Sequence, residues 1–241
     1  MNILIPMAGE GSRFKSAGYT FPKPLIDVDG KPMIQCVVEN LDFDANYIFL
    51  IRSEHVKQYS GLIDTLDRIT NGKFEYVIVE SLTEGAACTA LLAKEFIDND
   101  EDLLIANSDQ YIEYESENFT MLKNLTNTDS IVFTFNAVHP KWSFVKTNSR
   151  GFVTEVAEKK PISNIATCGI YWYRKGSDFV KYANRMIESN IRVNNEFYIA
   201  PVYNELISDG KTLIPFYVNT MSGLGTPEDL EKFLGRKRIL M

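Results

Sequence analysis

The first half of the chain alternates between short apolar runs and longer stretches of mixed apolar and polar residues. The apolar runs suit buried strands and lie at residues 2–8, 47–51, 74–79 and 102–106. Between them, apolar residues recur at helical spacing over 33–40, 54–59, 61–69 and 86–96, and a short hairpin is expected over 26–32. Ser53 stands where a cap of the 54–59 helix is expected. Strands that alternate with helices in this way predict a parallel sheet wound by right-handed crossovers.

The second half contains more strands and fewer helices. Strands are expected at residues 130–135, 143–147, 152–156, 167–173 and 212–217, with a hairpin-like turn at 148–151. Helices are expected at residues 176–188, 200–208 and 227–235. We find no internal repeat, low-complexity tract or linker between the halves. The pattern therefore predicts one α/β domain over residues 1–241, with halves that divide at about residues 128 and 129.

Composition and charge narrow the range of partners. The 241 residues are 45% hydrophobic and 24% charged, with a net charge of −7 and a pI near 5.0. This acidic balance argues against nucleic acid or an anionic membrane as the main partner. No apolar run approaches membrane-spanning length, and Pro6 and Gly9 interrupt the first one too early for a secretion signal. With three isolated cysteines expected to be free thiols, a cytoplasmic protein is expected.

The first candidate site is the glycine-rich turn Gly9–Arg13, which directly follows the first strand. Glycines let a backbone turn sharply and approach a ligand, and consecutive N–H groups in such a turn bind anions. Arg13 and Lys23 add cations suited to phosphate oxygens. Phe14 replaces the third glycine of the dinucleotide fingerprint, and the Gly-Lys-Ser/Thr of a P-loop is absent. The turn predicts a polyphosphate site; the alternative is an ordinary strand-to-helix turn with two surface cations.

Three further stretches carry candidate chemistry. Asp109 follows a buried strand and suits Mg²⁺, which prefers one or two carboxylates with phosphate oxygens and water; a solvated loop acid is the alternative. Small residues over 81–90 allow a flat base to approach the backbone, although Thr83 is equally suited to cap a helix. Lys159 and Lys160 follow a strand and suit a phosphate, and either one faces it, because strand neighbours point to opposite sides.

The order of four stretches resembles one family. They are Met7-Ala-Gly-Glu-Gly-Ser-Arg-Phe14, Phe21-Pro-Lys-Pro-Leu25, Ser108-Asp-Gln110 and Gly225-Thr-Pro-Glu-Asp-Leu230. Together they resemble the signature of the nucleotidyltransferases that activate sugar phosphates and related compounds. The likeness is to the bacterial capsule and surface-polysaccharide branch, and within it to the cytidylyltransferases that charge L-glutamine phosphate with CTP. The resemblance implies a Rossmann-like, mixed and mainly parallel sheet flanked by helices, with nucleotide bound by residues 1–128 and acceptor by residues 129–241.

The resemblance also implies roles for individual residues. Arg13 and Lys23 would be catalytic, and Asp109 would hold Mg²⁺. Lys159 or Lys160 and Glu196 would bind the acceptor, although Phe197 and Tyr198 beside Glu196 equally suit a core. Many family members carry a second metal-binding Asp where this chain has Gly223, a departure that argues against a second metal ligand and against a conventional hexose-phosphate acceptor and is compatible with an unusual one. The implied nucleotide-binding residues are Met7, Ala8, Gly9, Glu10, Gly11, Ser12, Glu80, Thr83, Gly85, Ala86 and Ser108.

The implied reaction joins a nucleotide to a phosphorylated small-molecule acceptor and releases pyrophosphate. CTP is the favoured donor, with L-glutamine phosphate as acceptor; UTP or dTTP with a sugar 1-phosphate is the alternative, since a backbone-lined loop suits any pyrimidine. A glycosyltransferase of the same fold would commonly carry Asp-x-Asp where this chain has Asn107-Ser-Asp-Gln110. A non-catalytic nucleotide-binding module is a third class. The sequence indicates no particular oligomeric state.

Overall fold

The computed structural model describes the backbone of residues 1–240 and the side chains of residues 1–237. Its centre is a nine-stranded sheet with the order β10-β9-β11-β6-β1-β4-β5, and β8 pairs with both β11 and β12. The strands are β1 Asn2–Pro6, β4 Asn46–Arg52, β5 Phe74–Val79, β6 Leu103–Ala106, β8 Ser130–Asn136, β9 Ser143–Thr147, β10 Val153–Glu158, β11 Ile165–Tyr173 and β12 Leu213–Tyr217.

The first-half strands of this sheet pair in parallel, as predicted, and antiparallel pairing begins where β11 joins β6. The Rossmann-like α/β class is therefore confirmed. Two small sheets lie outside the main one: β2 Asp27–Val28 with β3 Lys31–Pro32, and β7 Gln110–Glu113 with β13 Thr220–Gly223. The hairpin expected over residues 26–32 is the first of these.

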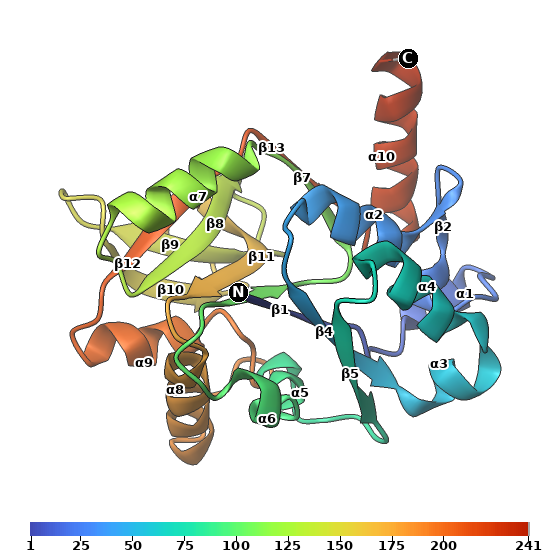
Figure 1. Cartoon of the computed structure of the whole chain (residues 1–241). Helices are drawn as coiled ribbons and strands as arrows, with labels where there is room; N and C mark the ends of the chain where they lie inside the picture. The colour runs from blue at the N-terminus through green and yellow to red at the C-terminus, as the bar shows by residue number, and fades with distance from the viewer. Residues whose placement is uncertain (241) are drawn as a thin grey trace.

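Helices cover both faces of the sheet (Figure 1). They are α1 Ser12–Ser16, α2 Met33–Leu41, α3 Ser53–Gln58, α4 Gly61–Thr70, α5 Ala86–Leu91, α6 Lys94–Ile97, α7 Ser116–Leu125, α8 Gly176–Glu188, α9 Val202–Ser208 and α10 Pro227–Leu240, with a 3₁₀ turn η1 at Lys23–Leu25. Side chains of α5, α8 and α9 share one core cluster with the sheet, and those of α2, α4 and α7 share the cluster on the other face. Phe14 of α1, Met33 of α2 and Leu230 of α10 belong to a third, smaller cluster.

Several sequence expectations need correction. The helix expected over residues 86–96 is two helices, α5 and α6, because Leu92 and Ala93 donate to carbonyls three residues back and tighten the turn. Ser53 is the first residue of α3 rather than its cap, a place that Arg52 takes without a side-chain bond. The elements β7, α7 and β13 were not expected.

Thr226 caps α10, since its Oγ1 accepts a hydrogen bond from the N–H of Asp229 at 3.1 Å. The three cysteines are free thiols, two of them buried. Among the helices of residues 1–240, none combines the length and apolar content needed to cross a bilayer.

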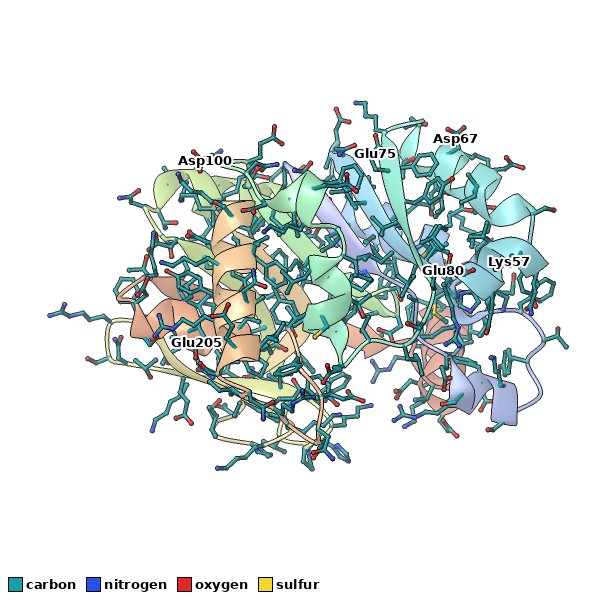
Figure 2. All side chains as sticks on the ribbon, turned by 90° about the horizontal axis from the view of Figure 1, so that it is seen from below. Lys57, Asp67, Glu75, Glu80, Asp100 and Glu205 are labelled. Carbon is teal, nitrogen blue, oxygen red and sulfur yellow. The ribbon has the colours of Figure 1, made fainter. Side chains whose placement is uncertain are left out.

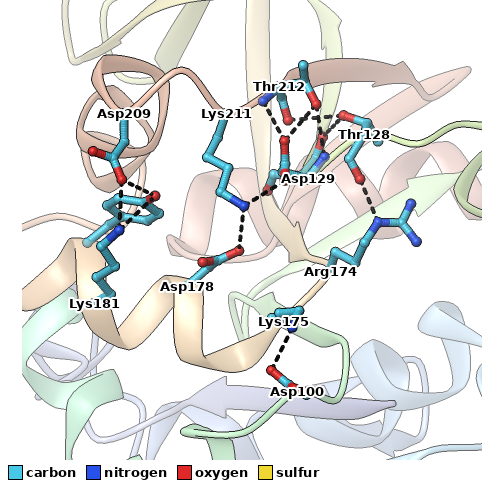
Figure 3. A network of polar contacts seen from close by, with 12 residues as sticks. Asp100, Thr128, Asp129, Arg174, Lys175, Asp178, Lys181, Asp209, Lys211 and Thr212 are labelled. Carbon is cyan, nitrogen blue, oxygen red and sulfur yellow. Dashed lines mark hydrogen bonds and ion pairs between the residues drawn. The ribbon is translucent and has the colours of Figure 1, made fainter.

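The point at which the sequence divides into halves is held by a polar network (Figure 3). Asp129 accepts hydrogen bonds from the N–H and hydroxyl of Thr212, at 2.8 and 2.9 Å, and from Lys211 at 2.9 Å. Arg174, just after β11, donates to the carbonyl of Thr128 at 2.7 Å. These bonds fix the start of β8 against the end of β11 and the start of β12. The fold therefore ties this boundary to the sheet on two sides.

Candidate functional site

The candidate residues meet where the chain order of the sheet reverses. β1 lies between β4 and β6 and runs parallel to both, so the turns that follow β1 and β6 leave the same edge side by side. Those turns carry Gly9–Arg13 and Ser108–Asp109. The carboxyl edge at such a switch point is where open α/β sheets bind ligands.

The glycine-rich turn has the backbone that its sequence predicts. Gly11 adopts a left-handed conformation with φ 62°, and a Cβ there would come within 3.3 Å of the Cβ of Lys23. Phe14 is buried and packs edge-on against Tyr19, with ring centroids 5.0 Å apart, which anchors the short helix α1. Arg13, on the same helix, is exposed. The buried phenylalanine thus fixes the turn while leaving the guanidinium accessible.

Lys23 and Asp109 form an ion pair, and each side chain is at most one quarter exposed. The closing segment crosses them: Leu224 donates its N–H to the carbonyl of Asp109 at 2.7 Å. A Cβ on Gly225 would come within 2.6 Å of Asp109 Oδ2 and 3.7 Å of Lys23 Nζ. A residue with a Cβ at position 225 would displace the Asp109 carboxylate from the charged pair. Three segments far apart in sequence therefore converge here.

These residues line a cleft of about 520 Å³, a size typical of small-molecule sites. Nine of the predicted site residues line it: Met7, Gly9, Gly11, Arg13, Lys23, Ala86, Ser108, Asp109 and Lys159. The charged residues of the lining are four cations, Arg13, Lys23, Lys141 and Lys159, and three carboxylates, Asp109, Glu158 and Asp229. The lining of the cleft has a net charge of +1, whereas the whole chain has a net charge of −7. An acidic protein binds a phosphate only where cations gather locally, and this cleft is such a place.

One wall of the cleft comes from β9, β10 and the segment before α9. Lys159 adopts a left-handed φ of 54° and places its ammonium 4.4 Å from the ring centroid of Tyr198, whose hydroxyl it contacts. Lys160 is exposed and does not line the cleft, so Lys159 is the lysine that faces it. Burial raises the pKa of Glu158, against the lowering effects of the hydrogen bond from Ser143 and of the charge of Lys159.

The loop over residues 81–90 has a different packing from the one that its small residues suggest. A Cβ on Gly85, which has a φ of 138°, would meet the backbone O and N of Phe197 at 2.4 and 2.5 Å. Phe197 donates its N–H to the carbonyl of Glu84, and its carbonyl accepts from the N–H of Ala87, both at 2.9 Å. The close approach at Gly85 is thus made by the chain itself. Thr83 bonds the carbonyl of Gly85 and the hydroxyl of Thr89 rather than capping α5.

The remaining predicted residues do not line the cleft, and their ligand contacts stay predictions. They are Ala8, Glu10, Ser12, Glu80, Thr83, Gly85, Lys160 and Glu196. Glu10 is exposed and lies 3.7 Å from Arg52. Glu80, labelled in Figure 2, follows β5 and is exposed. Glu196 is exposed, whereas Tyr198, two residues further on, lines the cleft.

Sequence reasoning missed several residues of the lining, among them Gln110, Lys141, Trp142, Glu158 and Tyr198. Glu158 and Tyr198 lie one and two residues from the predicted residues Lys159 and Glu196, and this nearness was the signal that could have identified them. Lys141 and Trp142 lie between two strands with no pattern around them. Gln110 is 5% exposed, and its Nε2 has no hydrogen-bond partner among the described side chains. A buried donor in a cleft wall fits a site whose ligand supplies an acceptor atom.

The donor set suits a magnesium ion only in company with a ligand. Among the side chains of residues 1–237, no group of three or more His, Cys, Asp or Glu is arranged to hold a metal ion. Mg²⁺ commonly takes one or two carboxylates and completes its shell with phosphate oxygens and water. Asp109 fits that use, since it lines the cleft beside the cations Arg13 and Lys23 and its carboxylate is partly exposed. An ion held there would neutralise phosphate charge.

The sequence model of the nucleotidyl transferase family matches residues 3–233. The chain belongs to the nucleotidyl transferase family. This membership confirms the prediction of a nucleotidyltransferase enzyme, and the cytidylyltransferase branch stays a prediction. The family match covers both halves of the chain and all the residues that line the cleft.

Individual relatives are distant. The bifunctional protein GlmU of Methanocaldococcus jannaschii is 25% identical over 180 residues, which are 73% of this chain and 40% of that protein. The GlmU of Methanococcus maripaludis is 31% identical over 136 residues, which are 54% of this chain and 31% of that protein. The chain thus spans well under half the length of these relatives. The UTP–glucose-1-phosphate uridylyltransferase AglF of Haloferax volcanii is 23% identical over 243 residues, covering 96% of this chain and 94% of that protein.

Solved structures share the fold. A nucleoside-diphosphate-sugar pyrophosphorylase from Vibrio cholerae superposes with a TM-score of 0.80 at 24% identity, over 97% of this chain and 99% of that chain. A UDP-glucose pyrophosphorylase complexed with UDP-glucose superposes with a TM-score of 0.78 at 19% identity, over 100% of this chain and 99% of that chain. At these identities the likeness confirms the architecture.

Proposed function

We propose that this nucleotidyl transferase joins the nucleotidyl group of a nucleoside triphosphate to a phosphorylated small-molecule acceptor and releases pyrophosphate. One arrangement carries the proposal: Arg13, Lys23 and Asp109 reach the same cleft from three separate segments at the carboxyl edge of β1 and β6. A cation cluster with one paired carboxylate suits a triphosphate with its magnesium. A glycosyltransferase, which uses a nucleotide sugar as its donor, has less use for Arg13 and Lys23.

The chemistry needs alignment more than proton transfer. An oxygen of the acceptor phosphate, already ionised at pH 7, attacks the α-phosphorus, and the bond from that phosphorus to the pyrophosphate oxygen breaks. Two anions must be brought together and the leaving charge stabilised, so cation placement contributes most of the catalysis. We assign Arg13 to the β- and γ-phosphates, Lys23 to the α-phosphate and the acceptor phosphate, and Asp109 to Mg²⁺.

The ion pair of Lys23 and Asp109 also balances the charge of the site before the nucleotide binds. Their ion pair keeps both charges balanced in a site where neither is more than one quarter exposed. Asp109 would hold Mg²⁺ when the nucleotide is bound, and the ammonium of Lys23 would then be available to the phosphates. The pair thereby avoids an uncompensated charge in the protein before the nucleotide arrives.

The acceptor is proposed at two levels. The name of the relative AglF, a UTP–glucose-1-phosphate uridylyltransferase, supports a sugar 1-phosphate as the acceptor class. The finer proposal, CTP with L-glutamine phosphate, comes from the resemblance of the sequence motifs, and Gly223, where many family members carry a metal-binding Asp, is compatible with such an unusual acceptor. The division of labour between residues 1–128 for the nucleotide and 129–241 for the acceptor is part of the same proposal.

Pyrophosphate release tests the function. The protein is incubated with Mg²⁺, each of CTP, UTP, dTTP, ATP and GTP, and a panel that includes glucose 1-phosphate and L-glutamine phosphate. Release that requires both a nucleotide and an acceptor, and that is lost in Asp109→Asn, is the expected result. In a parallel incubation with a nucleotide sugar in place of the nucleotide, its consumption without pyrophosphate release would indicate a glycosyltransferase. Nucleotide binding without turnover would indicate a binding module.

A further inference from the structure

Lys141 is a cation of the cleft that no sequence motif marks. It lies between β8 and β9, and its side chain is 42% exposed. It lines the cleft together with Arg13, Lys23 and Lys159. Because it reaches the cleft and remains accessible, it is available to a ligand.

The ammonium of Lys141 is held on two sides. Its Nζ lies 3.1 and 3.2 Å from the two carboxylate oxygens of Asp229 and 4.5 Å from the ring centroid of Trp142. A lysine ammonium carries three donors, so this contact with one carboxylate leaves donor capacity for a second anion. The carboxylate and the ring together restrict where the ammonium lies.

Gly223 makes room for this arrangement. A Cβ at residue 223 would come within 3.3 Å of Asp229 Oδ2. An aspartate at this position would therefore bring a second carboxylate against Asp229, and like charges at such a distance disfavour each other's ionised form. The glycine leaves Asp229 free to hold Lys141.

Lys141 lies near both the Lys23–Asp109 pair and the acceptor-side residue Lys159. Gly223, next to Asp229, and Gly225, next to the Lys23–Asp109 pair, are two residues apart, a span of at most about 7 Å. On the other side, the N–H of Lys159 donates to the carbonyl of Trp142 at 3.0 Å. Lys141 and Lys159 therefore project from neighbouring ends of β9 and β10, each against an aromatic ring.

We propose that Lys141 is a further catalytic residue that binds the phosphate of the acceptor together with Lys159, and that Asp229 is the residue that positions it. The inference rests on the proposed function for the identity of that phosphate as the attacking group. A phosphate dianion is better satisfied by two ammonium groups than by one, and these two lysines flank the same wall. Lys141 then holds the acceptor phosphate toward Lys23 and the α-phosphorus.

The first test measures phosphate binding without turnover. Inorganic phosphate is titrated at constant ionic strength, and the fluorescence of Trp142, which lies against Lys141, reports binding; Trp142→Phe identifies its share of the signal above buried Trp172. We expect Lys141→Met to weaken the saturable response about tenfold or more. The control Lys146→Met removes an exposed lysine of β9 outside the cleft and should titrate like the unsubstituted protein.

The second test uses the nucleotide and acceptor pair that releases pyrophosphate. Lys141→Met should raise the KM for the acceptor about ten- to hundredfold while the KM for the nucleotide changes less than about twofold. Lys141→Arg should recover part of the loss, and Asp229→Asn should show a smaller increase in the same KM.

The outcomes separate the two proposals. No pyrophosphate from the unsubstituted protein with any pair overturns the proposed function. Equal phosphate titrations of the unsubstituted protein and Lys141→Met, or no saturable response in either, overturn the role of Lys141. An increase in the nucleotide KM rather than the acceptor KM overturns its assignment to the acceptor phosphate.

Discussion

Arg13 and Lys23 face the cleft in different electrostatic states. Lys23 is paired with Asp109, whereas Arg13 has no ion-pair partner among the side chains of residues 1–237. A guanidinium without a protein partner retains its full capacity for phosphate oxygens. Its removal also leaves no buried carboxylate behind, so a substitution at Arg13 separates an effect on activity from an effect on stability.

Arg13→Ala should therefore reduce kcat strongly and leave folding unchanged. Loss of a preorganised transition-state charge costs about 2–4 kcal/mol, or roughly a 30- to 1000-fold fall in kcat. The free energy of unfolding should change by less than about 0.5 kcal/mol, as for exposed positions in general. Steady-state pyrophosphate release and urea unfolding measure the two effects. The control Arg150→Ala, at an exposed turn residue, should alter neither, and turnover of Arg13→Ala within threefold of the original contradicts the assignment.

Glu158 is a buried carboxyl group whose ionisation opposes folding. Burial raises its pKa in the folded protein, and the hydrogen bond from Ser143 and the charge of Lys159 compensate only in part. The folded chain then binds the proton more tightly than the unfolded chain, so stability falls as pH rises from the unfolded pKa through the raised folded one. The site keeps this group in the cleft at a cost in stability.

Glu158→Gln should make the protein more stable at pH 8 and have progressively less effect toward pH 4. The amide removes the buried charge and keeps a partner for the hydroxyl of Ser143. Urea unfolding across this pH range gives the difference directly. A control at Glu155, an exposed residue of the same strand, should show no such growth with pH. A stabilisation that is largest at low pH would contradict the explanation.

At the scale of elements, Gly85 joins two loops that the sequence places more than one hundred residues apart. The backbone of Phe197 lies against it and is bonded to both sides of the turn. Arg192, which pairs with Glu84, also lies 4.0 Å from the ring centroid of Phe197. Tyr198, next along the chain, contacts Lys159 of the cleft wall. The loop before α5 is thereby connected to the acceptor side of the site.

Gly85→Ala should be much more harmful than an alanine at another left-handed glycine. A Cβ there overlaps the backbone of Phe197 and meets an unfavourable φ, so the expected loss is about 3 kcal/mol or more. Gly151→Ala is the matched control, because residue 151 has a φ of 84° and no atom within 4 Å of the added Cβ. It should cost only about 1–2 kcal/mol. Urea unfolding compares the two, and equal losses would show that packing against Phe197 contributes nothing.

The elements that the sequence predicted are those with strong local patterns. The helix expected over 176–188 has those bounds in α8, where buried and exposed residues alternate at helical spacing. α7 was missed because its buried face is narrow: Phe119 and Leu122 pack against the core, while Met121 and Leu125 are exposed and blur the helical pattern. β7 and β13 were missed because each is four residues long and pairs with a partner about one hundred residues away.

The same distinction holds for the site. Arg13, Lys23 and Asp109 follow recognisable turns, so their approach to one cleft was predictable. The packing of the Phe197 backbone against Gly85 and the ion pair of Lys141 with Asp229 are contacts between residues 88 or more positions apart in sequence. No local pattern marks either partner of such a contact. Tertiary packing also shows a contact at Gly85 that the sequence did not indicate, because the backbone of Phe197 lies against it; the base contact of this loop stays a prediction.

At the scale of the whole molecule, the sheet continues through the boundary between the proposed halves. β11 of the second half pairs with β6 of the first, and Trp172 donates its Nε1–H to Asp102 at 3.2 Å. One core cluster includes Leu4 and Ile48 together with Phe179 and Val202. Division at residues 128 and 129 would expose this core and break the β6–β11 pair. The two halves are therefore expected to differ in function while folding together.

The full chain should accordingly unfold in one cooperative transition, and fragments 1–128 and 129–241 should not fold alone. Each fragment would carry an unpaired strand edge and half of a shared core, and the apolar area lost exceeds what a small fragment can spare. Trp172 fluorescence, which reports the junction, and far-UV circular dichroism should give the same urea midpoint for the full chain. A fragment with its own cooperative urea transition, or two separate midpoints in the full chain, would show that the halves are independent folding units. In that case the continuous sheet would be formed by two separately folded domains that pair at β6 and β11, and the shape of the cleft would depend on how the two domains associate.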